Sequence, residues 1–255
     1  MKHSTLKNNI IASLISILFI IGLLSIVSHI KQDNQIFPSL SEIGNCLYAN
    51  IVSKEVVLSF TLSIMRTFLV LFISLVFSLI TSLLYYYKKI TMSFLRPFIT
   101  IMKTAPLAAI SIYIFIIVDG QNANNLRPLL IGLLVTFPII LEGTISAVDH
   151  IDPSIISELA LTSGPKWFKF IKIYLPLMIP NIATTLLQTI GLGFKVIVMA
   201  EYLCYTKQSI GLLIYNSFMQ LNMANLLAII ILVVIIVVIG EFIVKKIEKN
   251  ILKAN

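Results

Sequence analysis

Four charged side chains lie inside long apolar runs of the sequence, where charge is rare and costly. They are Arg66, Glu142, Lys195 and Glu201. A charge at the centre of a bilayer costs at least about 2.5–3.5 kcal/mol, so such a side chain usually faces protein or water. We therefore expect these residues to line a water-filled cavity or to form structural contacts within a membrane bundle.

Their positions separate the four charges into two groups. Lys195, Glu201 and Arg66 fall in the outer halves of their apolar runs, where all three could line a cavity open to the outside. Alternatively, Arg66 could form a structural ion pair or bind backbone carbonyls, and Glu201 could lie at the membrane interface, exposed to water. Glu142 falls in the opposite half of its run, too deep on that side to pair with Lys195 of the same chain. Lys103, at the inner end of another run, is expected to extend its ammonium to the interface.

The sequence contains no pattern for chemistry on a substrate. It has no phosphate-binding loop, no nucleophile elbow and no carboxylate pair at helical spacing. The two cysteines and three histidines match no metal or redox spacing, so no catalytic residue, metal or cofactor is expected. If ATP drives this protein, the ATPase must be another chain.

The composition is that of a membrane protein. The chain has 255 residues, of which 58% are hydrophobic and 12% charged, and its mean hydropathy is +0.99. Soluble domains carry about 25% charged residues. These values exclude a disordered chain, a collagen, a disulfide scaffold and an ordinary cytosolic enzyme. The net charge of +8 is not gathered on one polar face, so it indicates membrane topology and not nucleic acid binding.

Six apolar runs are long enough to cross the roughly 30 Å of hydrocarbon, which takes about 20 helical residues. They predict an all-α polytopic membrane protein with spans at Ile10–Ile30, Val56–Tyr87, Phe98–Val118, Leu126–Val148, Leu175–Leu203 and Met223–Val244. Two lysines before the first run also resemble a signal peptide. That run is too long and lacks a small-residue cleavage site, so we retain it as a span.

The distribution of Lys and Arg predicts the orientation. Twelve lie at the termini or in the loops after the second and fourth spans, namely Lys2, Lys7, Lys88, Lys89, Arg96, Lys166, Lys169, Lys172, Lys245, Lys246, Lys249 and Lys253. Four lie in the other loops, namely Lys31, Lys54, Arg127 and Lys207. Because cytoplasmic loops are enriched in these residues, both termini are predicted to be cytoplasmic.

The loop between the fourth and fifth spans, residues 149–175, has an internal pattern. Asp152 followed by proline is typical of a helix N-cap, and Gly164-Pro165 is typical of a helix stop. A second amphipathic helix follows, with Lys166, Lys169 and Lys172 able to reach lipid headgroups, and Leu175-Pro176 is expected to turn the chain into the next span. From the residues alone, this loop is either a linker on the membrane surface or a docking element for a soluble partner.

The loop resembles the EAA loop of ATP-binding-cassette importer permeases, and the wider pattern resembles their nitrate/sulfonate/taurine-type branch. The pieces that carry the resemblance, in chain order, are Phe37-Pro38-Ser39, Ser63 with Arg66, Pro106, Phe137-Pro138-Ile139-Ile140-Leu141, Glu158 to Gly164, Leu175-Pro176, Pro180, Ala200-Glu201 and Ile210-Gly211. Each of these motifs is weak evidence for the family by itself, but the motifs occur in the expected order and together cover most of the chain. Leu159, Glu142 and Phe194 depart from the usual pattern, and the interval from Gly164 to Leu175 is one residue short.

The resemblance implies a permease that alternates its access between the two sides of a bacterial inner membrane. It implies a cytoplasmic ATPase, an extracytoplasmic solute-binding protein and a second permease copy as partners, besides membrane lipid. It also implies that the loop docks the ATPase, with Asp152, Glu158, Ala160, Gly164 and Pro176 as coupling residues. We expect one permease domain over residues 1–255, with a family-like core at about 56–246.

Alternatives remain open for the activity and for the substrate. A secondary transporter that works without an ATPase would show inverted repeats, and none is clear in the sequence. A membrane scaffold without transport activity is a further alternative. Lys195 favours an anion such as a sulfonate, nitrate or bicarbonate, while relatives also handle thiamine precursors and other aromatic solutes.

Overall fold

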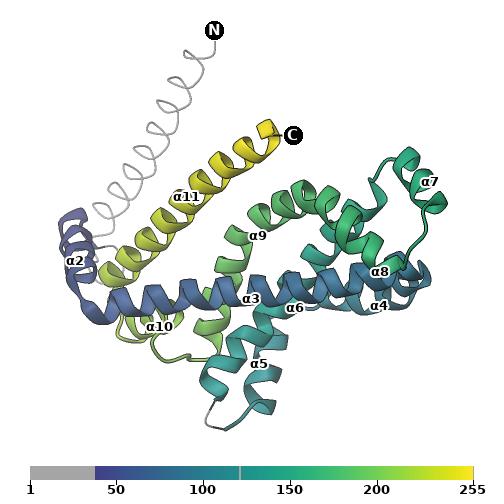
Figure 1. The fold of residues 1–255 in the computed structure, drawn as a ribbon. Coiled ribbons are helices and arrows are strands. Elements are labelled where there is room, and N and C mark those ends of the chain that lie inside the picture. Colours follow the sequence, from purple (N-terminus) through teal and green to yellow (C-terminus); the bar gives the residue numbers. More distant parts are fainter. Residues whose placement is uncertain (1–37, 121, 255) are drawn as a thin grey trace. The chain divides into compact units, whose positions relative to one another are not determined.

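The computed structural model describes residues 38–120 and 122–254, and within these ranges the chain forms helices and no strand. The helices, in chain order, are α2 (Leu40–Val52), α3 (Lys54–Tyr87), α4 (Ile90–Thr104), α5 (Leu107–Ile117), α6 (Ala123–Asp149), α7 (Pro153–Leu161), α8 (Lys166–Lys169), the π-helical turn η1 (Phe170–Tyr174), α9 (Leu175–Leu203), α10 (Ile210–Met219) and α11 (Met223–Ala254) (Figure 1). Contacts divide this part of the chain into two compact units, residues 38–57 with 213–233 and residues 58–212 with 234–254.

Four of the described helical segments are long and apolar enough to cross a membrane, and α4 with α5 adds a fifth if that bent pair is one span. Three of the four are α3, α6 and the uninterrupted run Lys166–Leu203, and the fourth is Met223–Val244 of α11. The predicted all-α polytopic fold is therefore confirmed for the described residues. The first predicted span, Ile10–Ile30, lies outside them.

The smaller unit is fixed by polar contacts near helix ends. Ser39 and Glu42 form a capping box at the start of α2, in which each side chain accepts a hydrogen bond from the other residue's backbone N–H. The Asn50 amide of α2 donates to Asn225 of α11 at 2.8 Å, and Asn225 donates in turn to the Ser217 hydroxyl of α10 at 2.9 Å. These side chains connect α2, α10 and α11 within the unit.

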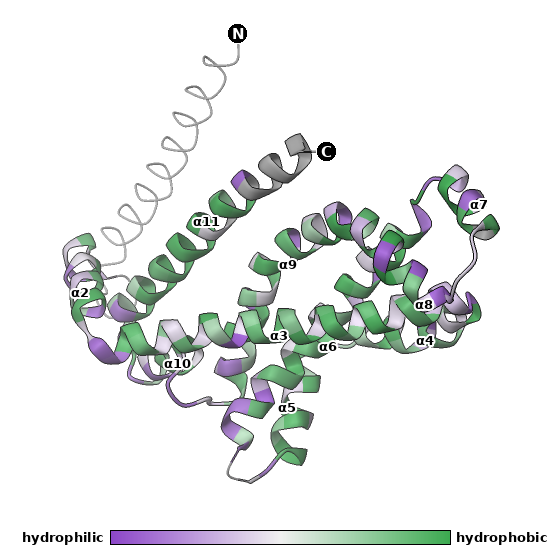
Figure 2. Ribbon diagram, viewed as in Figure 1, coloured by the Kyte–Doolittle hydropathy of each residue, from purple (hydrophilic) through white to green (hydrophobic). Residues whose placement is uncertain are grey.

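In the larger unit, the buried side of α3 includes many small hydroxyl side chains, while several of its large apolar side chains are exposed. Its buried residues include Ser63, Ser74, Ser78 and Ser82, whereas Phe68, Phe72 and Phe77 are more than half exposed. Figure 2 shows hydrophobic residues along most of α3, and many of the large ones are exposed. Helices in lipid gain little from burying apolar groups against each other, so small residues that permit close packing gather at their interfaces.

Helices α6 and α9 pack side by side within this unit. A Cβ atom at Gly143 of α6 would collide with the side chain of Thr185 on α9, so only glycine permits the observed approach. Toward the ends of α3 and α6, the Tyr85 hydroxyl donates to both carboxylate oxygens of Asp149 at 3.0 and 3.1 Å. The ring of Tyr86 lies 4.5 Å from that of Tyr174 in η1. The ends of α3, α6 and η1 are thereby held together.

The predicted third span, Phe98–Val118, is not one straight helix. Helix α4 begins eight residues earlier, at Ile90, and contains Pro97, while α4 and α5 meet at a bend of 99°. Pro106 lies at the bend, and Ala105 before it is extended, with φ −66° and ψ 134°. Proline lacks a backbone donor and disfavours the helical conformation of the preceding residue, which explains the break.

The entry into the fifth span also differs from the prediction. The sequence predicts a turn at Leu175-Pro176, but the chain runs as one helix from Lys166 to Leu203, with a π-helical turn at Phe170–Tyr174. A proline within a helix crowds the carbonyl four residues earlier and cannot donate to it. The wider π turn places an extra residue just before Pro176. In this turn, the Leu175 N–H donates to the carbonyl of Phe170, five residues earlier, and not to the carbonyl four residues earlier.

Candidate functional site

A buried ion pair connects α3 to the end of α9. The Arg66 Nη1 atom lies 2.9 Å from the Glu201 Oε1 atom, and the exposed fractions of the two residues are 8% and 0%. Serine 63, one turn before Arg66, donates its hydroxyl to the Glu201 Oε2 atom at 2.7 Å. The carboxylate is therefore bound by α3 through both of its oxygens.

Further contacts bring α6 and the loop after α9 into the same cluster. The Arg66 Nη2 atom donates to the Asn125 side-chain oxygen at 3.0 Å, and Nη1 donates to the Gln208 carbonyl at 3.3 Å. On the other side of the carboxylate, the Gly211 N–H donates to the Glu201 Oε2 atom at 3.4 Å. Arg66, Glu201, Ser63, Asn125 and Gly211 thus form one network, which we call the Arg66 cluster.

The loop that completes the Arg66 cluster adopts unusual backbone conformations. Tyr205 and Gln208 have φ values of +51° and +49°, which are rare for residues other than glycine. A Cβ atom at Gly211 would overlap the backbone of Glu201 and Tyr202, so only glycine fits there. Strained positions of this kind cost about 1–3 kcal/mol each and persist where surrounding contacts hold them.

This geometry separates the two interpretations that the sequence left open for Arg66 and Glu201. Both charges are paired, hydrogen-bonded and buried, so neither side chain presents a free charge to a cavity in this conformation. The arrangement is that of a structural pair that joins α3, α6 and α9 to the Ile210 end of α10. A pathway-lining role for these two residues remains an untested prediction.

Lys195 lies in a different setting, on an exposed strip of α9. Asn181, Gln188 and Lys195 recur at seven-residue intervals, which places them on one helix face, and all three are exposed. We call this face the α9 strip. It runs about 21 Å along the helix from Asn181 to Lys195 at 1.5 Å per residue. Leu192 and Met199 are exposed on the same face, so the α9 strip combines polar and apolar side chains. Its polar groups would lack partners in hydrocarbon and are expected to meet water or other protein.

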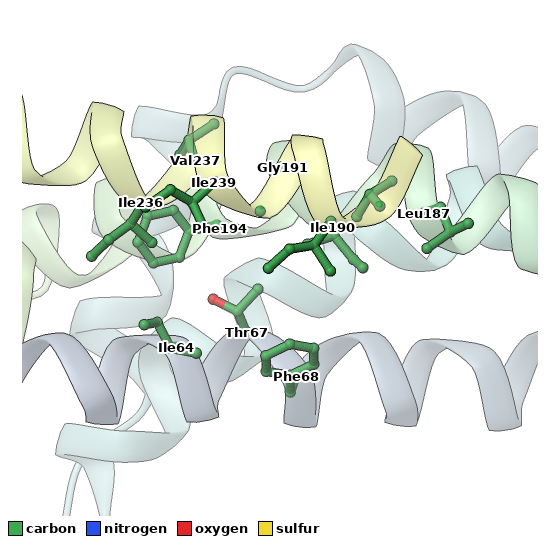
Figure 3. A pocket seen from close by; sticks show the side chains of 13 residues that line it. Ile64, Thr67, Phe68, Leu187, Ile190, Gly191, Phe194, Ile236, Val237 and Ile239 are labelled. Atoms are coloured by element: carbon green, nitrogen blue, oxygen red, sulfur yellow. The ribbon is translucent and has the colours of Figure 1, made fainter. Parts of the chain in front are cut away.

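An apolar pocket lies beside the same part of α9. Its walls come from α3, α9 and α11, and Figure 3 shows Ile64, Phe68, Ile190 and Phe194 among the side chains that line it. The lining includes no charged side chain, and its one hydroxyl, on Thr67, donates to the Ser63 carbonyl. Nothing in this lining would bind an ion.

Glu142 forms a salt bridge that the sequence does not predict. The Lys103 Nζ atom lies 2.9 and 2.7 Å from its two carboxylate oxygens, and both side chains are about half exposed. Helices α4 and α6 bring the two charges together, which the sequence does not reveal, while the extension of Lys103 to the interface stays a prediction.

The predicted coupling loop contains α7, and its start is as expected. The Asp152 carboxylate accepts hydrogen bonds from the Ser154 N–H at 2.8 Å and the Ser154 hydroxyl at 2.7 Å. These bonds stabilise the charged form and lower the pKa of Asp152 below its ordinary value. Gly164, beyond the end of the helix, has a φ of +128°, which L side chains rarely adopt.

Helix α7 is held to the rest of the unit at few points. Leu159 is buried and Ile155 packs behind it, while Glu158 is exposed and Leu161 is 88% exposed. The predicted coupling residue Pro176 lies on the continuous helix and is also exposed. The side chain of Ala160, another predicted coupling residue, lies outside the described part of the structure.

Lys169 has a role that the sequence analysis missed. Its ammonium donates to the carbonyls of Leu159 and Thr162, each at 2.7 Å, at the C-terminal end of α7. A cation at this end of a helix satisfies free carbonyls and complements the helix dipole. The prediction that Lys169 reaches lipid headgroups is therefore wrong in this conformation. A lysine eight residues after the end of a short helix is too weak a signal to predict the contact.

Within residues 38–120 and 122–254, no group of three or more His, Cys, Asp or Glu side chains could hold a metal ion. The two cysteines are free thiols, with Cys204 buried and Cys46 partly so.

The comparison with protein-family models gives a match. A family model described as "Binding-protein-dependent transport system inner membrane component" matches residues 74–253, which is more than half of the chain. No curated protein matched the chain. The matched range includes α7, the α9 strip and Glu201, while Ser63 and Arg66 precede it.

Proposed function

Because the chain belongs to the family of inner membrane components of binding-protein-dependent transport systems, we propose that it forms the translocation pathway for a small solute and is driven by a separate ATPase chain. The family is one of ATP-binding-cassette importer permeases, which are non-catalytic multi-pass proteins of the inner membrane. The further proposals concern its coupling element, its pathway residues, its partners and its orientation.

The observation that carries the coupling proposal is the exposure of α7. This helix is capped at Asp152, anchored through Leu159 and bound at its far end by Lys169, while Leu161 remains 88% exposed. A short helix that is bound near its C-terminal end to the following helix can pass on a movement that a partner imposes on its exposed face. We propose that Asp152, Glu158, Ala160, Gly164 and Pro176 form or support the surface that docks the ATPase.

For the pathway, we propose Lys195 as the residue that meets the solute. It lies on the exposed α9 strip, and none of the hydrogen bonds or ion pairs of the described residues involves its side chain. An ammonium at that depth supports an anionic solute, such as a sulfonate, nitrate or bicarbonate. A thiamine-precursor-like or other aromatic solute is the alternative.

The proposed assembly consists of two copies of this permease, two ATPase subunits and an extracytoplasmic solute-binding protein. Both termini would lie in the cytoplasm, as the Lys and Arg distribution predicts. In the proposed mechanism, ATP binding closes the ATPase pair and α7 moves with it. The pathway then changes sides, and the energy comes from the different affinities of ATP for the two arrangements.

The coupling proposal is tested by Gly164→Val, with Gly120→Val as a matched control. Both glycines have positive φ, +128° and +106°, and neither has an atom within 4 Å of the position of a new Cβ. Both variants carry the same backbone strain, but Gly120 follows α5, at the predicted outer side. We expect Gly164→Val alone to uncouple ATP hydrolysis from solute uptake in the reconstituted complex. Normal ATP-driven uptake by that variant would refute the docking assignment.

The pathway proposal is tested by Lys195→Met, with Lys172→Met as the control on the same helix. Lys172 is exposed near the start of the continuous helix and does not belong to the α9 strip. We expect Lys195→Met to reduce uptake per assembled complex while insertion and ATPase binding stay unchanged. Equal uptake rates and equal apparent affinities in wild type and variant would remove Lys195 from the pathway.

One observation favours a second candidate function. The break between α4 and α5 resembles the interrupted helices that secondary transporters use to bind ions and substrates. A transporter of that kind would need no ATPase. Two measurements on the full chain, purified from its native membrane, distinguish the two functions. An ATPase that co-purifies with the chain supports the importer. ATP-independent solute uptake by the reconstituted chain alone supports the secondary transporter.

A further inference from the structure

The Lys103–Glu142 salt bridge lies in an unexpected place for a pair that is half exposed. Lys103 is near the end of α4, and Glu142 is seven residues from the end of α6, or about 10 Å along the helix axis. The side chains are 42% and 46% exposed. Half-exposed charges at this depth are costly against hydrocarbon, so the pair must face water or another protein.

Helix α4 has two faces that differ in character. Phe94, Phe98 and Ile101 follow one another at helical spacing and are at least 55% exposed, as expected for a surface that contacts lipid. Arg96, Thr100 and Lys103 follow the same spacing on the opposite face and are also exposed. The salt bridge therefore belongs to the polar face of α4.

Helix α6 continues this polar face on the other side of the pair. Glu142, Ser146 and His150 are spaced four residues apart and are exposed, so they line the helix from its C-terminal end to the salt bridge. The His150 Nδ1 atom lies 2.7 Å from the Ser146 carbonyl oxygen, within hydrogen-bonding distance. We call Arg96, Thr100, Lys103, Glu142, Ser146 and His150 together the cytoplasmic strip.

The polar character ends at the salt bridge. On the same face of α6, the next positions toward the predicted outer side are the apolar Ile139 and Val135, which are only partly exposed. On α4, the helix ends one residue after Lys103 and the chain bends by 99°. The pair thus marks the boundary between a polar surface that starts at the predicted cytoplasmic side and an apolar region beyond it.

We propose that the cytoplasmic strip lines the inner half of a hydrated solute pathway and that the Lys103–Glu142 salt bridge closes the membrane end of that half. The inference rests on the proposed function, because only a transport subunit requires such a path. A closed ion pair is electrically neutral, so it keeps neither cations nor anions at the constriction. When it opens, the two charges become hydrated and water can pass beyond Glu142.

The test measures thiol accessibility in inside-out membrane vesicles from cells that produce the full complex. Single cysteines are placed at Thr100, Ser146, Phe98 and Val135 of a chain that carries Cys46→Ser and Cys204→Ser. The probe is a membrane-impermeant methanethiosulfonate with a sulfonate group. It reacts with thiolates, and each unit by which an apolar environment raises a thiol pKa lowers the thiolate fraction about tenfold.

We expect Thr100→Cys and Ser146→Cys to react at least about tenfold faster than Phe98→Cys, the matched position on the lipid-facing side of α4. Val135→Cys should be protected in the wild-type background and should become reactive when Glu142→Gln or Lys103→Gln is added. The charge swap Lys103→Glu with Glu142→Lys should restore its protection.

Other results would contradict the pathway or the gate. Slow reaction at both Thr100→Cys and Ser146→Cys would show that protein or lipid covers the strip and would overturn the pathway. Reaction at Val135→Cys with the salt bridge intact, or no change when Glu142→Gln is added, would overturn the gate. If the chain still co-purifies with an ATPase in either case, the proposed function stands while the inference fails.

Discussion

Glu201 shows how one carboxylate can organise four segments of a membrane protein. It has no exposed surface, and it accepts hydrogen bonds from Arg66, Ser63 and the Gly211 backbone. Burial of an ion pair is costly, and it is tolerated only where additional hydrogen bonds satisfy both charges. The Arg66 cluster meets this condition, which is why removal of either charge should be more harmful than removal of both.

Arg66→Met and Glu201→Met should each lower the free energy of unfolding by about 3–5 kcal/mol, because each leaves one buried charge without its partner. The double variant should be less destabilised than the sum of the two. Ser63→Ala, the control, leaves both charges in place but removes a hydroxyl that donates to the carboxylate, and it should cost about 1.5–3 kcal/mol. Denaturant titration of the purified chain in detergent measures all four, and additive effects of the two charges would contradict a coupled pair.

At the scale of elements, α7 depends on a contact from the helix that follows it. Lys169 binds the carbonyls of Leu159 and Thr162, so the end of α7 is joined directly to the continuous helix that runs to Leu203. A movement of α7 must therefore move Lys169 or break two charge-assisted hydrogen bonds.

Lys169→Met should loosen the last turn of α7 and weaken coupling to the ATPase. Hydrogen exchange at the amides of residues 159–162 should become faster, because the carbonyls lose their donor. Lys166→Met is the control, since Lys166 is exposed one turn earlier and has no hydrogen bond to α7 among the described residues. Unchanged exchange in Lys169→Met would show that Leu159 alone holds the helix.

The elements that the sequence predicts well have local signals. Asp152-Pro153 places the start of α7, and the apolar run that ends at Leu203 places the end of α9, although not the start of the continuous helix at Lys166. The sequence does not place the start of α4, because Pro97 is tolerated inside that helix. Nor does it reveal the partners of Arg66 and Lys103, since the Arg66–Glu201 pair joins residues 135 positions apart and depends on how the helices pack.

At the scale of the whole molecule, the twelve-to-four distribution of Lys and Arg predicts the orientation in the membrane. The polar contacts near Asp149 and the strip that ends at His150 lie on the side that this distribution assigns to the cytoplasm. The pathway and coupling proposals both assume this orientation.

Labelling in intact cells tests the orientation. Single cysteines at His3 and Lys253 should not react with an impermeant thiol reagent added outside, whereas a cysteine at Asn122, exposed in the turn between α5 and α6, should react. All three are placed in the chain without its two natural thiols. Reaction at positions 3 and 253 would contradict the prediction that both termini lie in the cytoplasm.

The serine-lined face of α3 has a consequence for how the protein responds to temperature. Phe68, Phe72 and Phe77 are exposed on α3, while Ser63, Ser74, Ser78 and Ser82 are buried. In a bilayer, we expect the exposed phenylalanines to contact lipid whether or not α3 is packed against its neighbours. Separation of the helices within the bilayer therefore exposes little new apolar surface to water. Exposure of apolar surface to water is the source of the large heat capacity change when soluble domains unfold. The stability of this bundle should accordingly vary almost linearly with temperature, without the curvature that leads soluble proteins to cold denaturation.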